Sequence, residues 1–278
     1  MSYFPVLRAR QYELIALREL SDLLSDSLIV PVMEPITSGY LASNLPLFVE
    51  AGMEFCLIVN PRLPRSQPLT QDEVFNELVL DILDEHQSFR PTLYVNGQTQ
   101  PAEIQAFSSR YAPLELERAY FLTSDPTYDT TQAILDDEAR YVLCREISGG
   151  TRNRFNWNLR VLIEDHFHPQ NNADYPPSES FSDRHLGSAA TDFAHFGDYS
   201  IIGDIFRETG GLPFAVAIHY MTVRHHTGNA LELRHYISDQ NQTRGKVAEK
   251  FFEALAGCGK MPNSHEFFCA DELGSLLG

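Results

Sequence analysis

The sequence predicts an α/β protein whose architecture is a TIM-like (β/α)8 barrel, irregular and with extra strands near the C-terminal third. Short apolar runs, typical of strands covered on both faces, alternate with longer segments of helical periodicity, as in parallel βαβ units. The chain has 278 residues, and a barrel of this kind typically takes about 250. Eight principal strands are expected to begin at Tyr3, Leu28, Glu54, Arg90, Arg118, Arg140, Arg160 and Phe214.

Local patterns define the elements of the first half. Leucines recur at three- and four-residue spacing over Gln11–Leu24, which predicts a helix with one apolar face. The apolar run Leu28–Pro35 predicts a strand, but Pro31 cannot donate to a β-ladder, so we expect irregular pairing there. Thr70 and Glu73 match a capping box, which predicts the start of a helix. The other expected elements are strands Tyr3–Ala9, Glu54–Pro61, Arg90–Gly97 and Arg118–Ser124, and helices Gly39–Gly52 and Pro101–Tyr111.

The second half contains the apolar strand Arg160–His168, which ends in several ionisable side chains. The polar segment Pro169–Pro177 behind it has no apolar periodicity and is expected to be a loop. A strong buried-strand pattern at Phe214–Met221 is expected to supply the eighth strand, with Asp198–Ile205 and Leu231–Ser238 as insertions or irregular elements. Also expected are helix Thr130–Glu138, strand Arg140–Ile147 and the closing helix Lys246–Cys258.

An open doubly wound sheet is the competing architecture. It is disfavoured because no glycine-rich turn follows the first strand, as a dinucleotide or phosphate binder of that class would need. No linker rich in Gly, Ser or Pro interrupts the chain, so we expect a single barrel-like domain over residues 1–278.

Charge and cysteine content argue against several classes of protein. The net charge of −17 disfavours non-specific binding to nucleic acid or to an anionic membrane, which requires clustered Lys and Arg. The four cysteines have no metal-ligand spacing, and Cys56 and Cys144 lie in apolar strands, which fits a reducing compartment. No apolar stretch approaches the roughly 20 residues of a membrane span. No signal-peptide pattern opens the chain, so a cytoplasmic protein is expected.

Polar side chains occur at the carboxyl ends of nearly all expected strands. Because the strands of a barrel converge on one mouth, residues far apart in the sequence become neighbours there. Side chains alternate between the two faces of a strand, so polar residues in step with the inward apolar positions point inward too. The candidate site residues are Arg8, Glu34, Asn60, Asn96, Glu146, Asp165 and His219. Arg145 and Glu146 point opposite ways, so only one of them can face the mouth.

Three interpretations of this polar ring stay open. Asp165, His219 and Glu34 are an acceptable ligand set for a divalent metal that activates water, so these three are the expected metal ligands. Paired carboxylates without a metal could instead perform general acid–base chemistry. The third interpretation is a hydrogen-bonded plug that closes the end of the barrel and has no catalytic role.

Several blocks of sequence carry a family resemblance. They are Tyr3–Leu20, Val30–Pro35, Asn172–Pro176, Phe196–Ser200 and Ala215–His219, which together span almost the whole chain. In these blocks the chain resembles the beta-protein family named from a T-even phage, and most of all its bacterial branch. The resemblance implies a barrel-like fold and an occurrence in bacteria, prophages and phages, and it assigns no activity to individual residues. A role in phage–host conflict is expected by association only.

These observations together predict a cytoplasmic bacterial or prophage barrel protein with a polar active site at the carboxyl-terminal mouth. Its chemistry would be metal-assisted or acid–base, and a divalent metal is the only cofactor that the residues suggest. The alternative is a non-catalytic binding protein that uses the barrel as a scaffold. In either case the partner would be a small molecule or another protein, which the sequence leaves unidentified.

Overall fold

The computed structural model describes residues 1–83, 86–184, 186, 192–206, 211–224 and 228–258. The chain divides into two compact units, where the sequence analysis expected one domain over residues 1–278. The first consists of Met1–Phe167 and Arg184–Phe206, and the second of His168–Asp183 and Arg207–Gly278. Cys269 and the His225–His226 pair lie outside the described residues.

The first unit is a closed barrel of eight parallel strands, which confirms the predicted (β/α)8 fold. In ring order the strands are β1 (Tyr3–Leu7), β2 (Val32–Met33), β3 (Phe55–Ile58), β4 (Phe89–Val95), β5 (Ala119–Leu122), β6 (Tyr141–Cys144), β7 (Arg160–Glu164) and β9 (His195–Asp198). β9 pairs with both β7 and β1 and so closes the ring.

The identity of the eighth strand differs from the prediction. Residues Phe214–Met221 were expected to close the barrel, but β10 (Ala217–Arg224) lies in the antiparallel sheet of the second unit. The strand that does close the barrel, β9, has four residues, and two of them are polar and one is glycine. A four-residue strand with one large apolar side chain carries almost no hydrophobic signal, whereas β10 is twice as long and more apolar. The stronger hydrophobic pattern at Phe214–Met221 therefore led to the wrong assignment of the eighth barrel strand.

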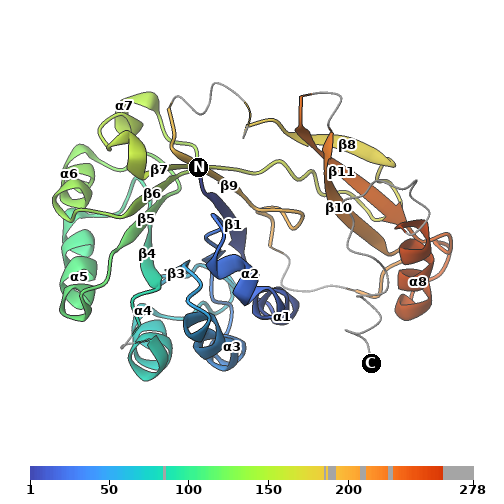
Figure 1. Cartoon of the computed structure of the whole chain (residues 1–278), viewed down its shortest axis with the longest axis horizontal. Coiled ribbons are helices and arrows are strands. Elements are labelled where there is room, and N and C mark those ends of the chain that lie inside the picture. Colours follow the sequence, from blue (N-terminus) through green and yellow to red (C-terminus); the bar gives the residue numbers. More distant parts are fainter. Residues whose placement is uncertain (84–85, 185, 187–191, 207–210, 225–227, 259–278) are drawn as a thin grey trace. The chain divides into compact units, whose positions relative to one another are not determined.

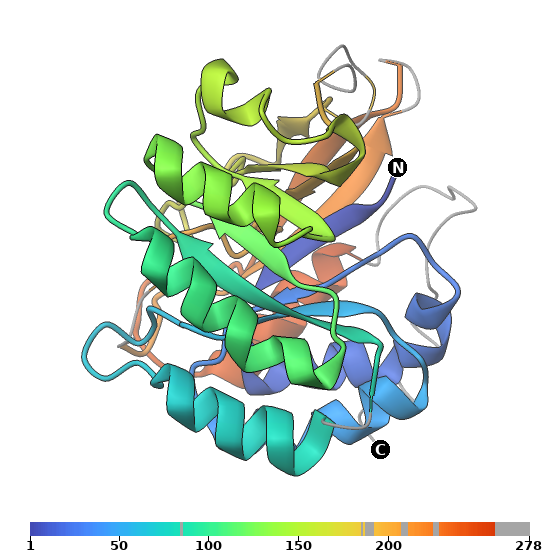
Figure 2. The ribbon, with the colours of Figure 1, turned by 90° about the vertical axis from the view of Figure 1, so that its left-hand side faces the viewer.

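Helices cover the outside of the barrel strands (Figure 1, Figure 2). They are α1 (Gln11–Glu19), α2 (Ser21–Ser25), α3 (Ser38–Glu50), α4 (Gln71–Glu73), α5 (Pro101–Tyr111), α6 (Tyr128–Asp136) and α7 (Gly149–Arg152). α4 continues into a π-helical segment, Val74–Leu83. The capping box at its start is formed as predicted, because the Thr70 hydroxyl accepts from the Glu73 amide and the Glu73 carboxylate accepts from the Thr70 amide.

Irregular pairing around Pro31 also agrees with the sequence analysis. Ile29 forms an isolated parallel bridge with Tyr3, and regular pairing resumes only in the two-residue strand β2. The Pro31 carbonyl still accepts a hydrogen bond from the Cys56 amide. The strand thus keeps its acceptor on one side where proline removes the donor.

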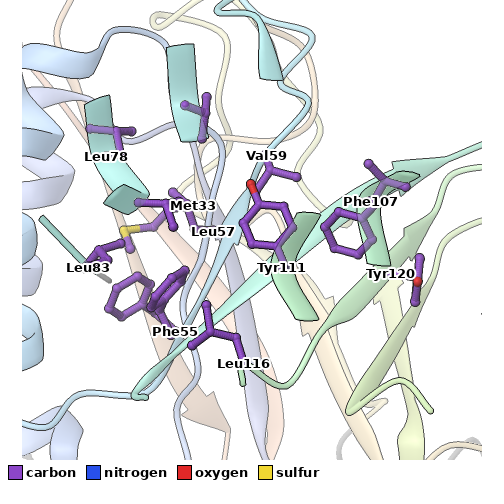
Figure 3. Packing of buried hydrophobic residues seen from close by; sticks show 14 of the residues in the cluster. Met33, Phe55, Leu57, Val59, Leu78, Leu83, Phe107, Tyr111, Leu116 and Tyr120 are labelled. Carbon is purple, nitrogen blue, oxygen red and sulfur yellow. The ribbon is translucent and has the colours of Figure 1, made fainter. Parts of the chain in front are cut away.

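Two apolar layers hold the barrel together. One fills its interior and includes Phe4, Val32, Ile58 and Phe121. The other packs the outward side chains of the strands against the helices; Figure 3 shows part of it, including Met33, Leu57, Leu78, Phe107 and Tyr120. Each strand contributes side chains to both layers because successive side chains point to opposite faces.

Closure between β9 and β1 depends on Gly197. A methyl group at this position would overlap the carbonyl oxygen of Phe4 and lie within 2.7 Å of Ile163 Cδ1. A larger residue could not be accommodated without separating the strands, so the glycine is required by the close approach of the neighbouring backbone.

The second unit contains a three-stranded antiparallel sheet in the order β10, β11 (Ala230–Ile237) and β8 (Ser178–Ser182), with the helix α8 (Val247–Cys258). Its unusual feature is Lys250, which is fully buried. The Lys250 ammonium group donates to the carbonyl oxygens of Phe214, at 2.8 Å, and of Thr243. No helix in the described part of the chain is long and apolar enough to cross a membrane.

Candidate functional site

Arg8 and Glu34 form a buried ion pair at the carboxyl ends of β1 and β2. Phe4 and Val6 point into the barrel and Arg8 follows them inward, as Glu34 follows Val32. Arg8 Nη1 lies 2.6 Å from Glu34 Oε2, and the two residues are 4% and 1% exposed. Charges buried this deeply are tolerated only when further hydrogen bonds compensate for their lost hydration.

Glu34 has such hydrogen bonds on both carboxylate oxygens. The Tyr94 hydroxyl donates to Oε2 at 3.1 Å, and the Arg62 amide donates to Oε1 at 2.8 Å. Burial, and then the neighbouring Glu34 charge, raise the pKa of Tyr94 well above its usual value, so the hydroxyl remains a donor. The Arg62 guanidinium lies over the Tyr94 ring, 4.6 Å from its centroid. For Glu34 this arrangement agrees with the plug interpretation.

The loop after β9 adds Tyr199 and Asp204 to the mouth. Arg145 Nη1 lies 2.7 Å from Asp204 Oδ2 and donates to the Tyr199 hydroxyl at 3.2 Å. Arg8 Nη2 reaches the same loop, at 2.8 Å from the Asp204 carbonyl oxygen and 3.1 Å from Asp204 Oδ1. Both guanidinium carbons lie 5.0 Å from the Tyr199 ring centroid. Burial raises the pKa of Tyr199 to about 12.

Asp165 positions this loop. Its Oδ2 accepts from the Asp204 amide at 2.9 Å, and its Oδ1 accepts from the Phe167 amide at 3.2 Å. Val161 and Ile163 belong to the interior layer, so Asp165 follows them on the inward face, as the alternation predicted. The structure therefore brings Asp165 together with Arg8 and Glu34 through Asp204.

Asn60 and Asn96 have local roles instead. The Asn60 amide donates to the Tyr94 carbonyl at 3.0 Å and its side-chain oxygen accepts from the Tyr94 amide at 2.7 Å, so Asn60 extends the β3–β4 pairing. Asn96 Oδ1 accepts from the Gln98 amide at 2.8 Å, which fixes the turn before α5. Neither arrangement requires a ligand.

Glu146 and His219 do not join the ring. The Glu146 side chain is 75% exposed, and it is Arg145 that bonds into the mouth. His219 belongs to β10 in the second unit, because Phe214–Met221 is not a barrel strand. Its Nδ1 lies 2.7 Å from His235 Nδ1, and burial, followed by the His235 charge, lowers the pKa of His219 to about 4.

The donors expected to hold a divalent metal are therefore not assembled as predicted. Glu34 is occupied by Arg8, Tyr94 and the Arg62 amide, and His219 is in a different sheet. Within the described residues, no group of three or more His, Cys, Asp or Glu side chains could hold a metal ion. The residues present at the mouth do not fit the expected metal site.

An open pocket of about 610 Å³ lies at the carboxyl ends of β6 and β7. Its volume falls within the range of about 300–1,000 Å³ that is usual for small-molecule sites. Three arginines line it, together with three carboxylates and one histidine. These residues are Arg145, Arg152, Arg184, Glu146, Glu164, Asp165 and His166.

Glu164 and His166 form a close pair in the lining of this pocket. His166 Nε2 lies 3.2 Å from Glu164 Oε2, and Arg184 Nε lies 3.0 Å from the same oxygen. The hydrogen bond from His166, with the charge of Arg184, lowers the pKa of Glu164. The carboxylate stays ionised and can orient the imidazole, as in other sites where a carboxylate supports a histidine base.

Sequence reasoning missed Tyr199 and Asp204 because they lie in the run Asp198–Ile205, which was assigned to an insertion. Phe196 and Gly197 precede this run and belong to β9. The sequence signal that could have located them is an aromatic residue and a carboxylate that follow the short strand β9 in the chain. Arg62 was missed because it lies beyond the end of β3, outside the strand alternation.

Comparison with known proteins adds no family assignment, since no family model matches the sequence and no curated protein matches it significantly.

Proposed function

We propose that this chain binds a small polar molecule in the pocket at the carboxyl ends of β6 and β7 and performs acid–base chemistry on it. The supporting observation is the combination of a pocket of about 610 Å³ with a Glu164–His166 couple in its lining, in which His166 Nε2 lies 3.2 Å from the Glu164 carboxylate. In (β/α)8 proteins this end of the barrel is where catalytic residues gather. The site therefore differs from the metal ring expected from the sequence.

The chemistry follows from the charges of the lining. A neutral His166 would accept a proton from a ligand hydroxyl or a carbon acid, and Glu164 would stabilise the imidazolium that forms. Arg184 keeps Glu164 ionised, so Glu164 remains an orienting acceptor and does not take the proton itself. Arg152, which is held by an ion pair with Asp192 at 2.7 Å and by the Phe193 ring at 5.0 Å, could orient an acidic or hydroxyl group of the ligand.

The test is a thermal-shift screen of the full-length protein against small polar metabolites, followed by calorimetric titration and product analysis of any hit. His166→Gln should bind the hit within about threefold of the original affinity but turn it over at least about 100-fold more slowly, the usual contribution of a general base. His86→Gln, a substitution at a histidine outside the pocket lining, is the matched control. Equal turnover by His166→Gln and the unchanged protein would refute the catalytic role.

A non-catalytic binding protein is the second candidate function. It is favoured by the ion-paired mouth, in which Glu34 is held by Arg8, Tyr94 and the Arg62 amide. This candidate predicts that a ligand of the pocket is recovered chemically unchanged after prolonged incubation, and that Arg184→Gln weakens its binding. Conversion of the ligand would exclude it.

We also propose, from the sequence blocks described above, that the chain is a bacterial or prophage member of the beta-protein family with a role in phage–host conflict. The test is plaque formation on cells that do or do not express the protein. Expression of the His166→Gln variant in the same assay shows whether a reduction in plaque number depends on the pocket. Equal plaque numbers over a broad phage panel would count against this role.

A further inference from the structure

The side chain of Asp204 lies between two guanidinium groups at the barrel mouth. Its Oδ1 is 3.1 Å from Arg8 Nη2 and its Oδ2 is 2.7 Å from Arg145 Nη1. Each carboxylate oxygen thus faces a different arginine, which is how a free carboxylate is recognised in binding sites. Both guanidinium carbons lie 5.0 Å from the ring centroid of Tyr199, so the two arginines contact the same aromatic side chain.

The arginine on the inner side is built into the barrel. Arg8 is 4% exposed, and its orientation is fixed by the ion pair with Glu34 at 2.6 Å. Its Nε–H is buried and has no hydrogen-bond partner among the described residues. A buried guanidinium donor without an acceptor is costly, so it marks a place where another acceptor would be favourable.

The charges around Asp204 also favour an anion. Glu146, 3.8 Å from Arg145, is 75% exposed and largely solvated, so it is left out of the balance. The remaining groups are three positive charges, from Arg8, Arg62 and Arg145, and three negative charges, from Glu34, Asp165 and Asp204. If the Asp204 carboxylate turned away, the mouth would keep one excess positive charge. In a protein of net charge −17, such a local excess would be matched best by one monoanionic group.

Asp204 can turn away without loss of the loop conformation. The Asp204 amide is held by Asp165 Oδ2 at 2.9 Å and its carbonyl by Arg8 Nη2 at 2.8 Å, so the backbone has anchors of its own. The side chain is 35% exposed, in contrast to the buried Arg8 and Glu34. A rotation about χ1 therefore exchanges the carboxylate with solvent and needs no backbone movement.

We propose that Arg8 and Arg145 form a carboxylate-binding subsite, which the chain's own Asp204 occupies in this structure, and that a ligand carboxylate binds there by displacing Asp204. Arg145 also lines the pocket at the ends of β6 and β7. This inference rests on the proposed function. The same ligand would place its carboxylate between Arg8 and Arg145 and its reacting group beside His166. Asp204 would then set the affinity, because the ligand must compete with an internal carboxylate at high effective concentration.

The test uses acetate as the probe and acetamide as its neutral isostere, with the full-length protein. Asp204→Ala removes the internal competitor and leaves the space that acetate fills. We expect saturable stabilisation of Asp204→Ala by acetate, with an apparent Kd at least about tenfold lower than for the unchanged protein. Acetamide should give no saturable effect in either protein. Asp204→Asn, which retains the shape of the side chain, is the second variant in case the alanine variant does not fold, and should bind acetate more tightly than the unchanged protein.

Two controls exclude a general salt effect. Asp72→Ala removes an exposed aspartate whose ion pair with Arg110 has the same 2.7 Å separation, and it should show no acetate dependence beyond that of the unchanged protein. Arg145→Gln in the Asp204→Ala background should abolish the saturable effect. Equal stabilisation of the Asp204 and Asp72 variants, or equal effects of acetate and acetamide, would overturn the proposal.

The outcome is separable from that of the proposed function. Acetate binding to Asp204→Ala with no ligand for the pocket would support the subsite and count against the proposed function. A pocket ligand whose turnover depends on His166, but whose affinity is the same in Asp204→Ala, would support the function and overturn the subsite.

Discussion

Replacement of Glu34 by Gln tests whether the ion pair with Arg8 holds the barrel mouth together. Gln keeps the size and shape of the side chain and removes only the charge and one acceptor oxygen. The ion pair at 2.6 Å is lost, and the Tyr94 hydroxyl and the Arg62 amide must share a single amide oxygen. Among the described residues, Asp204 is then the one carboxylate that still pairs with the buried guanidinium of Arg8.

The expected cost is large. Removal of one partner from a buried ion pair leaves an uncompensated charge and typically costs about 3–5 kcal/mol of folding free energy. The exposure of 4% for Arg8 and 1% for Glu34 places this pair at the buried limit. Asp204 offsets part of the loss because it stays within 3.1 Å of the same guanidinium. We therefore expect Glu34→Gln to lower the free energy of unfolding by about 3 kcal/mol.

Urea denaturation followed by tryptophan fluorescence measures this quantity for the barrel unit, because the single tryptophan of the chain, Trp157, lies in that unit. Glu19→Gln is the matched control. Its ion pair with Arg18 is also 2.6 Å long but is about 40% exposed on both sides, so its loss should cost no more than about 0.5 kcal/mol. A destabilisation below about 1 kcal/mol for Glu34→Gln, with an unchanged m-value, would refute the structural role and favour a catalytic one.

Three further predictions concern other positions. Gly197→Ala should prevent β1–β9 closure and sharply lower the melting temperature or soluble yield, whereas Gly39→Ala, where a methyl group meets no atom within 4 Å, should be neutral or slightly stabilising. Because the pKa of His219 falls from 6.5 to about 4 on folding, the unfolded chain binds the proton first as the pH drops. The second unit should therefore lose about 1–2 kcal/mol of stability between pH 6.5 and 4, after allowance for solvent screening, and a His219 imidazole that titrates near 6.5 by NMR would contradict this. Lys250→Met should destabilise α8 by at least about 2 kcal/mol, because it removes the charged donor to the carbonyl oxygens of Phe214 and Thr243, and hydrogen exchange of the α8 amides would show whether it does.

The sequence predicted the strands that are apolar on both faces. β3, β5, β6 and β7 all lie within the predicted ranges, because strands covered on both sides leave an uninterrupted hydrophobic signal. The same reasoning failed for β9, whose short polar sequence is held by its two neighbours and by the close approach at Gly197. In that strand tertiary pairing, and not local preference, determines the conformation.

For the site, strand alternation located Glu34 and Asp165 on the inward face, since a period of two is a local property of a strand. Alternation could not reveal what those side chains contact. The contacts of Asp204 with Arg8, Arg145 and Asp165 join residues up to 196 positions apart in the sequence. For His219 the sequence predicted a strand correctly but assigned that strand to the wrong sheet.

The sequence by itself determined the (β/α)8 class and the inward direction of Glu34 and Asp165 at their strand ends, because both follow from periodicities within single elements. Only the tertiary structure decided which strand closes the barrel and which charges meet at its mouth. The tertiary structure shows an arginine–carboxylate network at the mouth in place of the expected metal ring. Beside this network lies a polar pocket that shares Arg145 and Asp165 with it. The physical reason is that ring closure and ion pairing are interactions between distant segments, which leave no periodic signal in the chain.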